Sequence, residues 1–130
     1  MKEFLNYAEN NAQDILETLK TMVELESFTS DKQGTDELSD YLIQRLHGLG
    51  AEITVIPQDQ VGNHVVADIE GGEGRIMLLC HMDTVWPKGT IDDRPFTVNG
   101  GLAYGPGILD MKAGIAIALH ALEPLRTNGV

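Results

Sequence analysis

The chain has 130 residues, enough for one domain with its own core but not comfortably for two. Hydrophobic residues make up 42% and charged residues 22% of it, a globular composition that excludes a disordered or fibrous chain. Nine Lys and Arg against twenty Asp and Glu give a net charge of −11, which repels phosphate backbones and anionic membranes. We therefore expect no nucleic-acid partner and no membrane partner.

The sequence also bears on the compartment. Cys80 is the only cysteine, so no disulfide can form within the chain, and its apolar neighbours predict that it packs as a small hydrophobe. The first residues lack the apolar core and cleavage site of a signal peptide, and no stretch approaches ~18 consecutive apolar residues. We expect a soluble, cytoplasmic protein.

Two helices are predicted at the start of the chain. Apolar residues recur at spacings of three and four along residues 2–26, which predicts an amphipathic helix with a break near residues 9–14. A second helix is expected to begin after an N-cap at Thr35 and to end at Gly48 or Gly50.

Three strands are predicted next, over residues 51–57, 63–70 and 75–81. The third is almost wholly apolar, which is typical of a central strand covered on both faces. A hairpin turn is expected at Asn99 and Gly100.

An alanine-rich helix follows from about Met111, which Pro124 bends or ends. Two helices, three strands, a hairpin and a helix in this order fit a layered α/β sheet better than a bundle or a sandwich.

Candidate metal-binding residues lie at two places that such a fold can bring together. His81 and Asp83 follow the apolar strand, where open α/β sheets place their ligand crevices. Asp110 comes 29 positions after His81, in a loop with Gly105 and Gly107 that leads into a helix. Imidazole and carboxylate are ligands that zinc accepts, and a second carboxylate can orient a ligating histidine. By itself a His-x-Asp pair is a weak signal.

The two motifs also resemble a known family. "CHMDTVWPKG" followed by "RPFTVNGGLAYGPGILDMKAG", with "LESFTS" upstream, is similar to the zinc exopeptidases and deacylases that include bacterial glutamate carboxypeptidase, acetylornithine deacetylase and succinyl-diaminopimelate desuccinylase. The resemblance implies a three-layer α/β/α domain, a partial aminopeptidase-like zinc hydrolase (phosphorylase/hydrolase-like) fold. Residues 1–130 would be the amino-terminal portion of the catalytic domain, without the family's dimerisation domain.

The resemblance also implies roles for the candidate residues. His81 would bind one zinc ion and Asp110 would bridge two. Asp83 would be a catalytic residue that lies behind His81, on the side away from the metal. Cobalt or manganese are alternatives, because His and Asp suit all three metals. A metal-activated water would cleave the amide bond of a small peptide or an N-acyl amino acid.

The sequence departs from the family after Asp110. The family's Glu-Glu pair, a further acidic ligand and a late histidine have no counterparts, since Glu123 is the only later acidic residue. We therefore expect an incomplete and inactive fragment of a metallopeptidase or amidohydrolase. The alternative is a non-catalytic folded domain, or a truncation product that self-associates into a homo-oligomer through exposed sheet edges.

Other polar residues receive weaker interpretations. Lys112 is a candidate for contact with a substrate carboxylate or with Asp110, because a lysine in a first helical turn opposes the helix dipole. Trp86 lines a pocket mouth or packs. Asp92 and Asp93 are expected in a solvated loop. No role is assigned to the other histidines, His47, His64 and His120.

Overall fold

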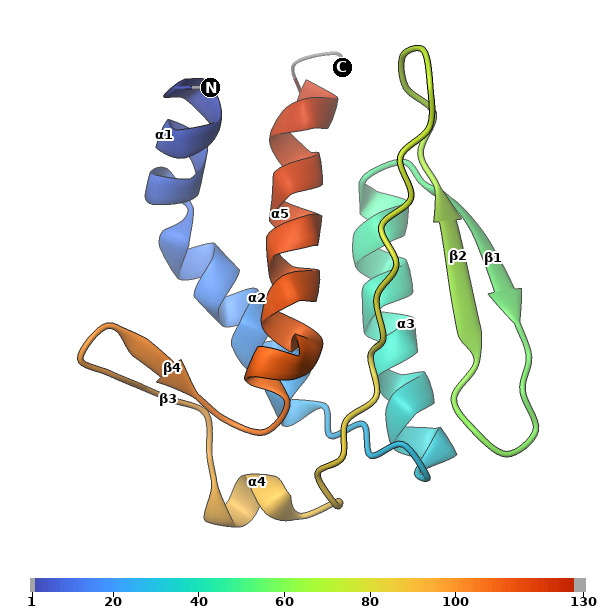
Figure 1. Cartoon of the computed structure of the whole chain (residues 1–130), viewed down its shortest axis with the longest axis vertical. Coiled ribbons are helices and arrows are strands. Elements are labelled where there is room, and N and C mark those ends of the chain that lie inside the picture. Colours follow the sequence, from blue (N-terminus) through green and yellow to red (C-terminus); the bar gives the residue numbers. More distant parts are fainter. Residues whose placement is uncertain (1, 128–130) are drawn as a thin grey trace.

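The computed structural model of this chain describes residues 2–127. Its helices are α1 (Lys2–Asn10), α2 (Ala12–Glu24), α3 (Lys32–Gly48), α4 (Thr90–Asp93) and α5 (Ala113–Thr127). Its strands are β1 (Glu52–Ile56), β2 (His64–Asp68), β3 (Thr97–Asn99) and β4 (Leu102–Tyr104), and a distorted helical turn, η1 (Ile108–Lys112), leads into α5. In Figure 1, α5 lies between α1 and α2 on one side and α3 on the other, with β1 and β2 beyond α3. Within residues 2–127 no helix is both long and apolar enough to cross a membrane.

The hydrophobic core lies where α2, α3 and α5 meet. Its buried members are Leu19, Met22 and Val23 of α2, Leu38 and Leu42 of α3, and Ile115, Ala116 and Leu119 of α5. Spacings of three and four place them on one face of each helix, as predicted for residues 2–26. Met22 and Leu38 are fully buried, and burying such a side chain stabilises the fold by roughly 1.5–3 kcal/mol.

The ends of the helices differ in detail from the prediction. The break in the first helical segment is confirmed at Asn11, between α1 and α2. The predicted N-cap at Thr35 is wrong: Asp31 caps α3, because its carboxylate accepts the backbone N–H of Gly34. Pro124 does not end α5, which continues to Thr127.

The strands form two separate antiparallel hairpins, β1 with β2 and β3 with β4. The first confirms the predicted strands within residues 51–57 and 63–70. In the second, Asn99 pairs with Leu102, so Gly100 and Gly101 make the turn, with φ of +59° and +79°. The hairpin prediction is confirmed, with its turn one residue later than expected, and both glycines adopt the left-handed backbone that this turn requires.

The predicted central strand is wrong. Residues 75–81 run as an extended segment in front of the helices (Figure 1), with no strand beside them among residues 2–127. Ile76 and Leu79 leave 91% and 83% of their surface exposed, and Cys80 is exposed rather than packed. An apolar run predicts burial but does not specify a pairing partner, and among residues 2–127 the strands pair only as β1 with β2 and β3 with β4.

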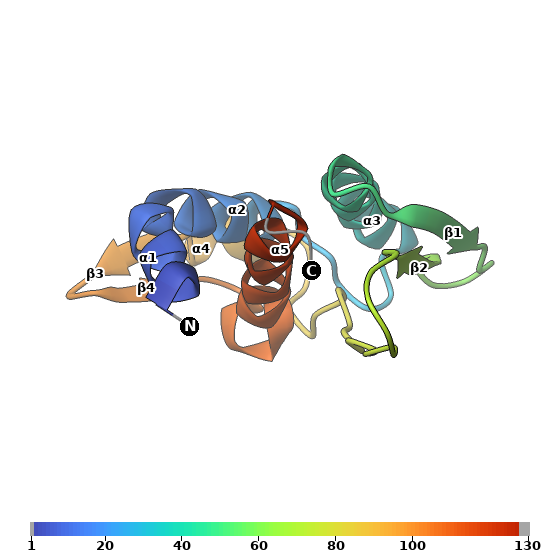
Figure 2. The ribbon, with the colours of Figure 1, turned by 90° about the horizontal axis from the view of Figure 1, so that it is seen from above.

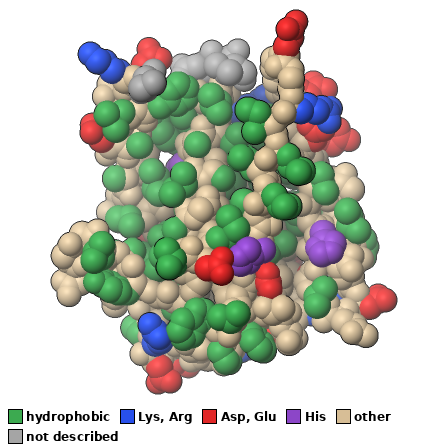
Figure 3. Space-filling view, viewed as in Figure 1, with side chains coloured by type: hydrophobic (Ala, Val, Ile, Leu, Met, Phe, Trp, Pro, Cys, Tyr) green, Lys and Arg blue, Asp and Glu red, His purple; other side chains and the backbone are tan. Residues whose placement is uncertain are grey.

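The fold is also more open than predicted. The chain exposes 8693 Å² of surface, whereas a compact folded chain of its size exposes roughly 6,800 Å². Figure 2 shows the helices and the first hairpin in a row, and Figure 3 shows hydrophobic side chains gathered over the face that carries α5 and the extended segment. The mixed α/β class is confirmed, but the three-layer α/β/α arrangement is not.

A buried lysine ties the last helix to α2. Lys112 is 1% exposed, and its Nζ donates to the backbone carbonyls of Met22 at 2.7 Å and Leu25 at 3.0 Å. The carbonyls at a helix C-terminus lack partners within the helix and attract positive charge. Burial lowers the pKa of Lys112 to about 8, against the opposite effect of Glu26. Lys112 thus bonds to the end of α2, not to Asp110 as the sequence suggested.

A polar network joins the other end of the helices. Arg45 donates to Thr18 at 2.9 Å and pairs with Glu123 at 3.0 Å, and Tyr7 donates to Glu123. His120, 5% exposed, lies with its Nε2 2.9 Å from the Thr18 hydroxyl. Its Nδ1 has no hydrogen-bond partner among the described residues, and the Glu123 carboxylate is 3.6 Å away. Burial therefore lowers the pKa of His120 below its ordinary value of 6.5.

We expect Lys112→Met to lower the free energy of unfolding by about 1–3 kcal/mol, because two carbonyls at the end of α2 lose their donor inside the protein. Urea denaturation followed by circular dichroism measures this change. Lys20→Met is the matched control on α2, since the Lys20 side chain is 40% exposed and its pair with Glu17 spans 3.7 Å. Equal effects of the two substitutions would show that the buried contacts do not stabilise the fold.

We also expect the stability to depend on His120 at acid pH. Because its folded pKa lies below 6.5, the unfolded chain binds more protons between those two pKa values. The free energy of unfolding then falls as pH decreases from 6.5 through the folded pKa, by at most about 1.4 kcal/mol per pH unit from this group. Urea denaturation between pH about 8 and about 5 should show this extra loss in the wild type but not in His120→Gln. Parallel pH profiles would contradict it.

Candidate metal centre

Two short backbone contacts fix the segment that carries His81 and Asp83. Phe28 forms an isolated parallel bridge with Thr84: the Thr84 N–H donates to the Ser27 carbonyl at 2.7 Å, and the Thr29 N–H donates to the Thr84 carbonyl at 2.9 Å. The Ser27 hydroxyl donates to the carbonyl of Met82 at 2.7 Å. The chain that follows α2 therefore holds this segment in place.

The second loop approaches through Gly107. Its φ is +73°, and a Cβ atom there would lie 2.5 Å from a methyl carbon of Thr84, so only glycine allows the two loops to meet. The Lys112 N–H donates to the Gly107 carbonyl at 3.0 Å and closes η1. Asp110 is extended inside this turn, with φ of −134° and ψ of 94°, and the Asp110–Met111 peptide bond is cis.

These two loops bring the three predicted residues together. His81 Nε2 lies 2.8 Å from Asp110 Oδ1, and His81 Nδ1 lies 3.0 Å from the backbone carbonyl oxygen of Asp83. The Asp83 carboxylate is slightly farther from the ring, with Oδ1 3.4 Å from Nδ1. The backbone N–H of His81 also donates to the Met111 sulfur at 3.3 Å, which ties the backbone of His81 to the second loop. The roles that the resemblance implies for Asp83, His81 and Asp110 stay predictions.

Both nitrogens of His81 face hydrogen-bond acceptors. A neutral imidazole has one N–H, so it can donate to the Asp83 carbonyl or to the Asp110 carboxylate, but not to both. When the proton is on Nδ1, the Nε2 lone pair faces the Asp110 carboxylate oxygen. A positive charge placed between these two acceptors would interact favourably with each of them. The hydrogen bond with Asp110 accordingly raises the pKa of His81 above 6.5, against the opposite effect of its partial burial. A proton therefore fits between these two groups, and a metal ion bound by both would take its place once they move slightly apart.

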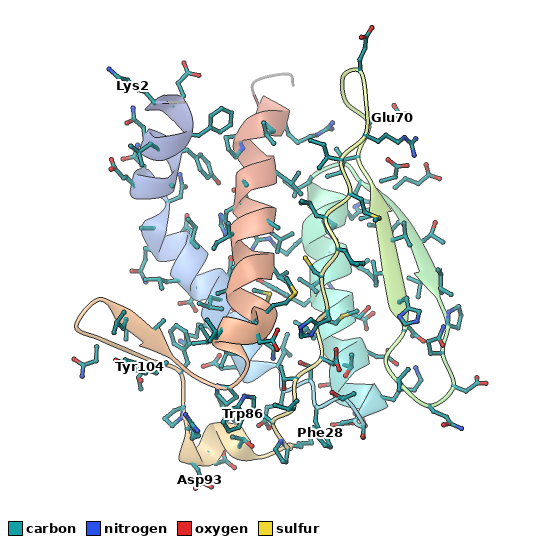
Figure 4. The ribbon with its side chains drawn as sticks, viewed as in Figure 1. Lys2, Phe28, Glu70, Trp86, Asp93 and Tyr104 are labelled. Carbon is teal, nitrogen blue, oxygen red and sulfur yellow. The ribbon has the colours of Figure 1, made fainter. Side chains whose placement is uncertain are left out.

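The pair opens into a hollow of about 210 Å³, whose lining includes Thr29, Trp86 and Leu109 besides the three candidate residues. Trp86 lies at the same end of the molecule as Phe28 and α4 (Figure 4), and the Arg94 guanidinium lies 4.6 Å from the centre of its ring. Trp86 thus both lines the hollow and packs. Asp92 and Asp93 form the end of α4 and are exposed.

The donor types suit zinc, but their number is low. Imidazole nitrogen and carboxylate oxygen are zinc ligands. The 2.8 Å between Nε2 and Oδ1 is a hydrogen-bond distance, shorter than the roughly 3.3 Å between two ligands of one tetrahedral ion, so the two side chains would move slightly apart to bind one. Among residues 2–127, no group of three or more His, Cys, Asp or Glu side chains is placed to hold a metal ion. This part of the chain therefore offers two facing ligands.

Sequence reasoning missed several residues that support this site. The Glu26 carboxylate accepts the backbone N–H groups of Gly89 at 2.7 Å and Ile91 at 3.0 Å, and the Thr29 hydroxyl donates to Asp83 Oδ2 at 2.6 Å. Both residues belong to the "LESFTS" stretch, whose polar side chains after an apolar helix were the available signal. Their partners are more than fifty positions away, so no local pattern identifies them.

Comparison with known proteins agrees with the motifs. Residues 77–130 match peptidase family M20/M25/M40. The chain is 39% identical to carboxypeptidase G2 of Pseudomonas sp. (strain RS-16) over 119 residues, which is 89% of this chain and 29% of that protein. It is 36% identical to a succinyl-diaminopimelate desuccinylase of Corynebacterium glutamicum, over 75% of this chain and 24% of that protein. It is 27% identical to an acetylornithine deacetylase of Klebsiella pneumoniae, over 88% of this chain and 32% of that protein.

The chain thus spans less than a third of the length of each of these relatives. The region of similarity to carboxypeptidase G2 is nevertheless most of the chain, and the family match contains both His81 and Asp110. The resemblance indicated by the two motifs is therefore confirmed: over residues 77–130 the chain is similar to peptidase family M20/M25/M40, and along most of its length it is similar to a carboxypeptidase and to deacylases.

Proposed function

We propose that this chain forms part of the active site of a metal-dependent hydrolase, in which His81 and Asp110 bind zinc and Asp83 orients His81. The substrate class is a small peptide or an N-acyl amino acid, cleaved at its amide bond. The relatives named as carboxypeptidase, desuccinylase and deacetylase support this class. Cobalt or manganese could replace zinc at a site of this composition.

The observation that carries the proposal is the facing pair of His81 Nε2 and Asp110 Oδ1 at 2.8 Å. The Asp83 carbonyl, 3.0 Å from Nδ1, favours the imidazole form that keeps its proton on Nδ1 and presents the Nε2 lone pair. A carbonyl or carboxylate behind a ligating histidine is the usual means of fixing its tautomer and raising its basicity. The donor types of the three residues and the orientation of His81 support the proposed zinc site.

When bound, zinc would polarise the scissile carbonyl and lower the pKa of a water molecule. The residues of this chain contribute ligation and orientation. Their hollow, about 210 Å³, is smaller than the roughly 300–1,000 Å³ of complete ligand pockets, so it accommodates only part of a substrate. Catalytic zinc sites normally have three protein ligands and a water, so groups other than those of residues 2–127 complete the proposed centre. The complete site would hold two ions.

We expect the 130-residue chain to bind zinc weakly and His81→Ala to weaken that binding by at least about tenfold, because it removes one of two facing ligands. Isothermal titration measures both affinities. His64→Ala is the control, since His64 is an exposed histidine on β2, outside the hollow. Equal zinc affinity in the wild type and in His81→Ala would contradict the proposed centre. Turnover of an N-acylated amino acid by the 130-residue chain, lost in His81→Ala, would contradict the prediction that the site of this chain is incomplete.

A second candidate function is a non-catalytic domain that self-associates into a homo-oligomer through exposed backbone edges. The exposed apolar segment formed by residues 76–79 favours it, because an extended segment without a neighbouring strand can pair with another chain. The net charge of −11 opposes association at low salt.

If this candidate is correct, sedimentation velocity will show association that strengthens with salt. Leu79→Lys will weaken the association constant by at least about tenfold, because it places a charge on the pairing segment. Val98→Lys on β3 is the matched control, since Val98 is 52% exposed on the other hairpin. A monomer at every protein and salt concentration would exclude self-association.

A further inference from the structure

The hydroxyl of Thr29 makes the shortest side-chain contact to Asp83. Thr29 Oγ1 lies 2.6 Å from Asp83 Oδ2, a distance typical of a hydroxyl that donates to an ionised carboxylate. The same hydroxyl is 3.1 Å from the Thr84 carbonyl, which already accepts the Thr29 N–H at 2.9 Å. The single hydroxyl proton therefore belongs to the carboxylate contact.

The position of this hydroxyl is fixed by the backbone. The two hydrogen bonds on either side of the Phe28–Thr84 bridge hold Thr29, which lies in the turn that follows Phe28, beside Asp83. Threonine is branched at Cβ, so its χ1 angle has few alternatives in such a conformation. Thr29 consequently presents its oxygen to Asp83 at little further loss of conformational entropy.

We propose that Thr29 is a positioning residue: its hydroxyl holds Asp83 Oδ2, so that Oδ1 and the carbonyl of Asp83 stay turned toward His81 Nδ1. Those two oxygens lie 3.4 Å and 3.0 Å from Nδ1. The order of contacts runs from Thr29 through Asp83 and His81 to Asp110, and it connects the end of α2 to the facing ligand pair. This inference deepens the proposed function and rests on it.

The chain offers a pair of variants that separates the hydroxyl from the shape of the side chain. Thr29→Val keeps the branched shape and removes the hydroxyl, whereas Thr29→Ser keeps the hydroxyl. We expect Thr29→Val to weaken zinc binding by the 130-residue chain by about tenfold, within the range typical of residues that orient a ligand, and Thr29→Ser to retain wild-type affinity. In an Asp83→Ala background, Thr29→Val should have no further effect, because its partner is gone.

A measurement without metal keeps this inference distinct from the proposed function. Long-range ¹H–¹⁵N NMR of His81 in the metal-free chain reports which ring nitrogen carries the proton. We expect the Nδ1–H form to be less populated in Thr29→Val than in the wild type and to be restored in Thr29→Ser. If zinc affinity is independent of His81, the proposed function fails, and the NMR comparison alone decides the role of Thr29. Wild-type proton placement and zinc affinity in Thr29→Val, or equal losses in both variants, would overturn it.

Discussion

The C-terminal end of α2 is the constraint on which the candidate site depends. Its unpaired carbonyls accept the ammonium of Lys112, which attaches the second loop, and the residues that follow it hold the first loop through backbone bonds to Thr84. Both loops are thus held by the end of one helix, α2, whose apolar face is buried in the core. The distance between His81 and Asp110 is a consequence of that shared support.

Electrostatics explains why a cation belongs at this point. The chain is strongly acidic, with a net charge of −11, and the imidazole of His81 lies between oxygen atoms of Asp83 and Asp110. One imidazole proton cannot satisfy both sides, so a second proton or a metal ion completes the arrangement. Lys112, a buried cation of this loop, does not serve that purpose because it donates its hydrogen bonds to the carbonyls at the end of α2.

Local patterns in the sequence predicted what is local in the structure. The helical spacing over residues 2–26 and the Asn-Gly hairpin are present. His81, Asp83 and Asp110 also lie together, although the strand expected to carry His81 is not formed. Among residues 2–127, no strand pairs with residues 75–81 as expected. An apolar run indicates that a segment can be buried but not which strands will pair with it. The partners of Lys112 and Thr29 were unpredictable for the same reason, since each contact joins positions more than fifty residues apart.

We propose, as the centre of this interpretation, that His81 presents Nε2, not Nδ1, to a metal ion shared with Asp110. The most direct test is ¹⁵N NMR of the ring nitrogens of His81 during addition of zinc to the chain. We expect the Nε2 resonance to shift while Nδ1 keeps its proton, and Asp110→Ala to reduce the shift at a given zinc concentration. A zinc-dependent shift at Nδ1, or no change at either nitrogen, would contradict it.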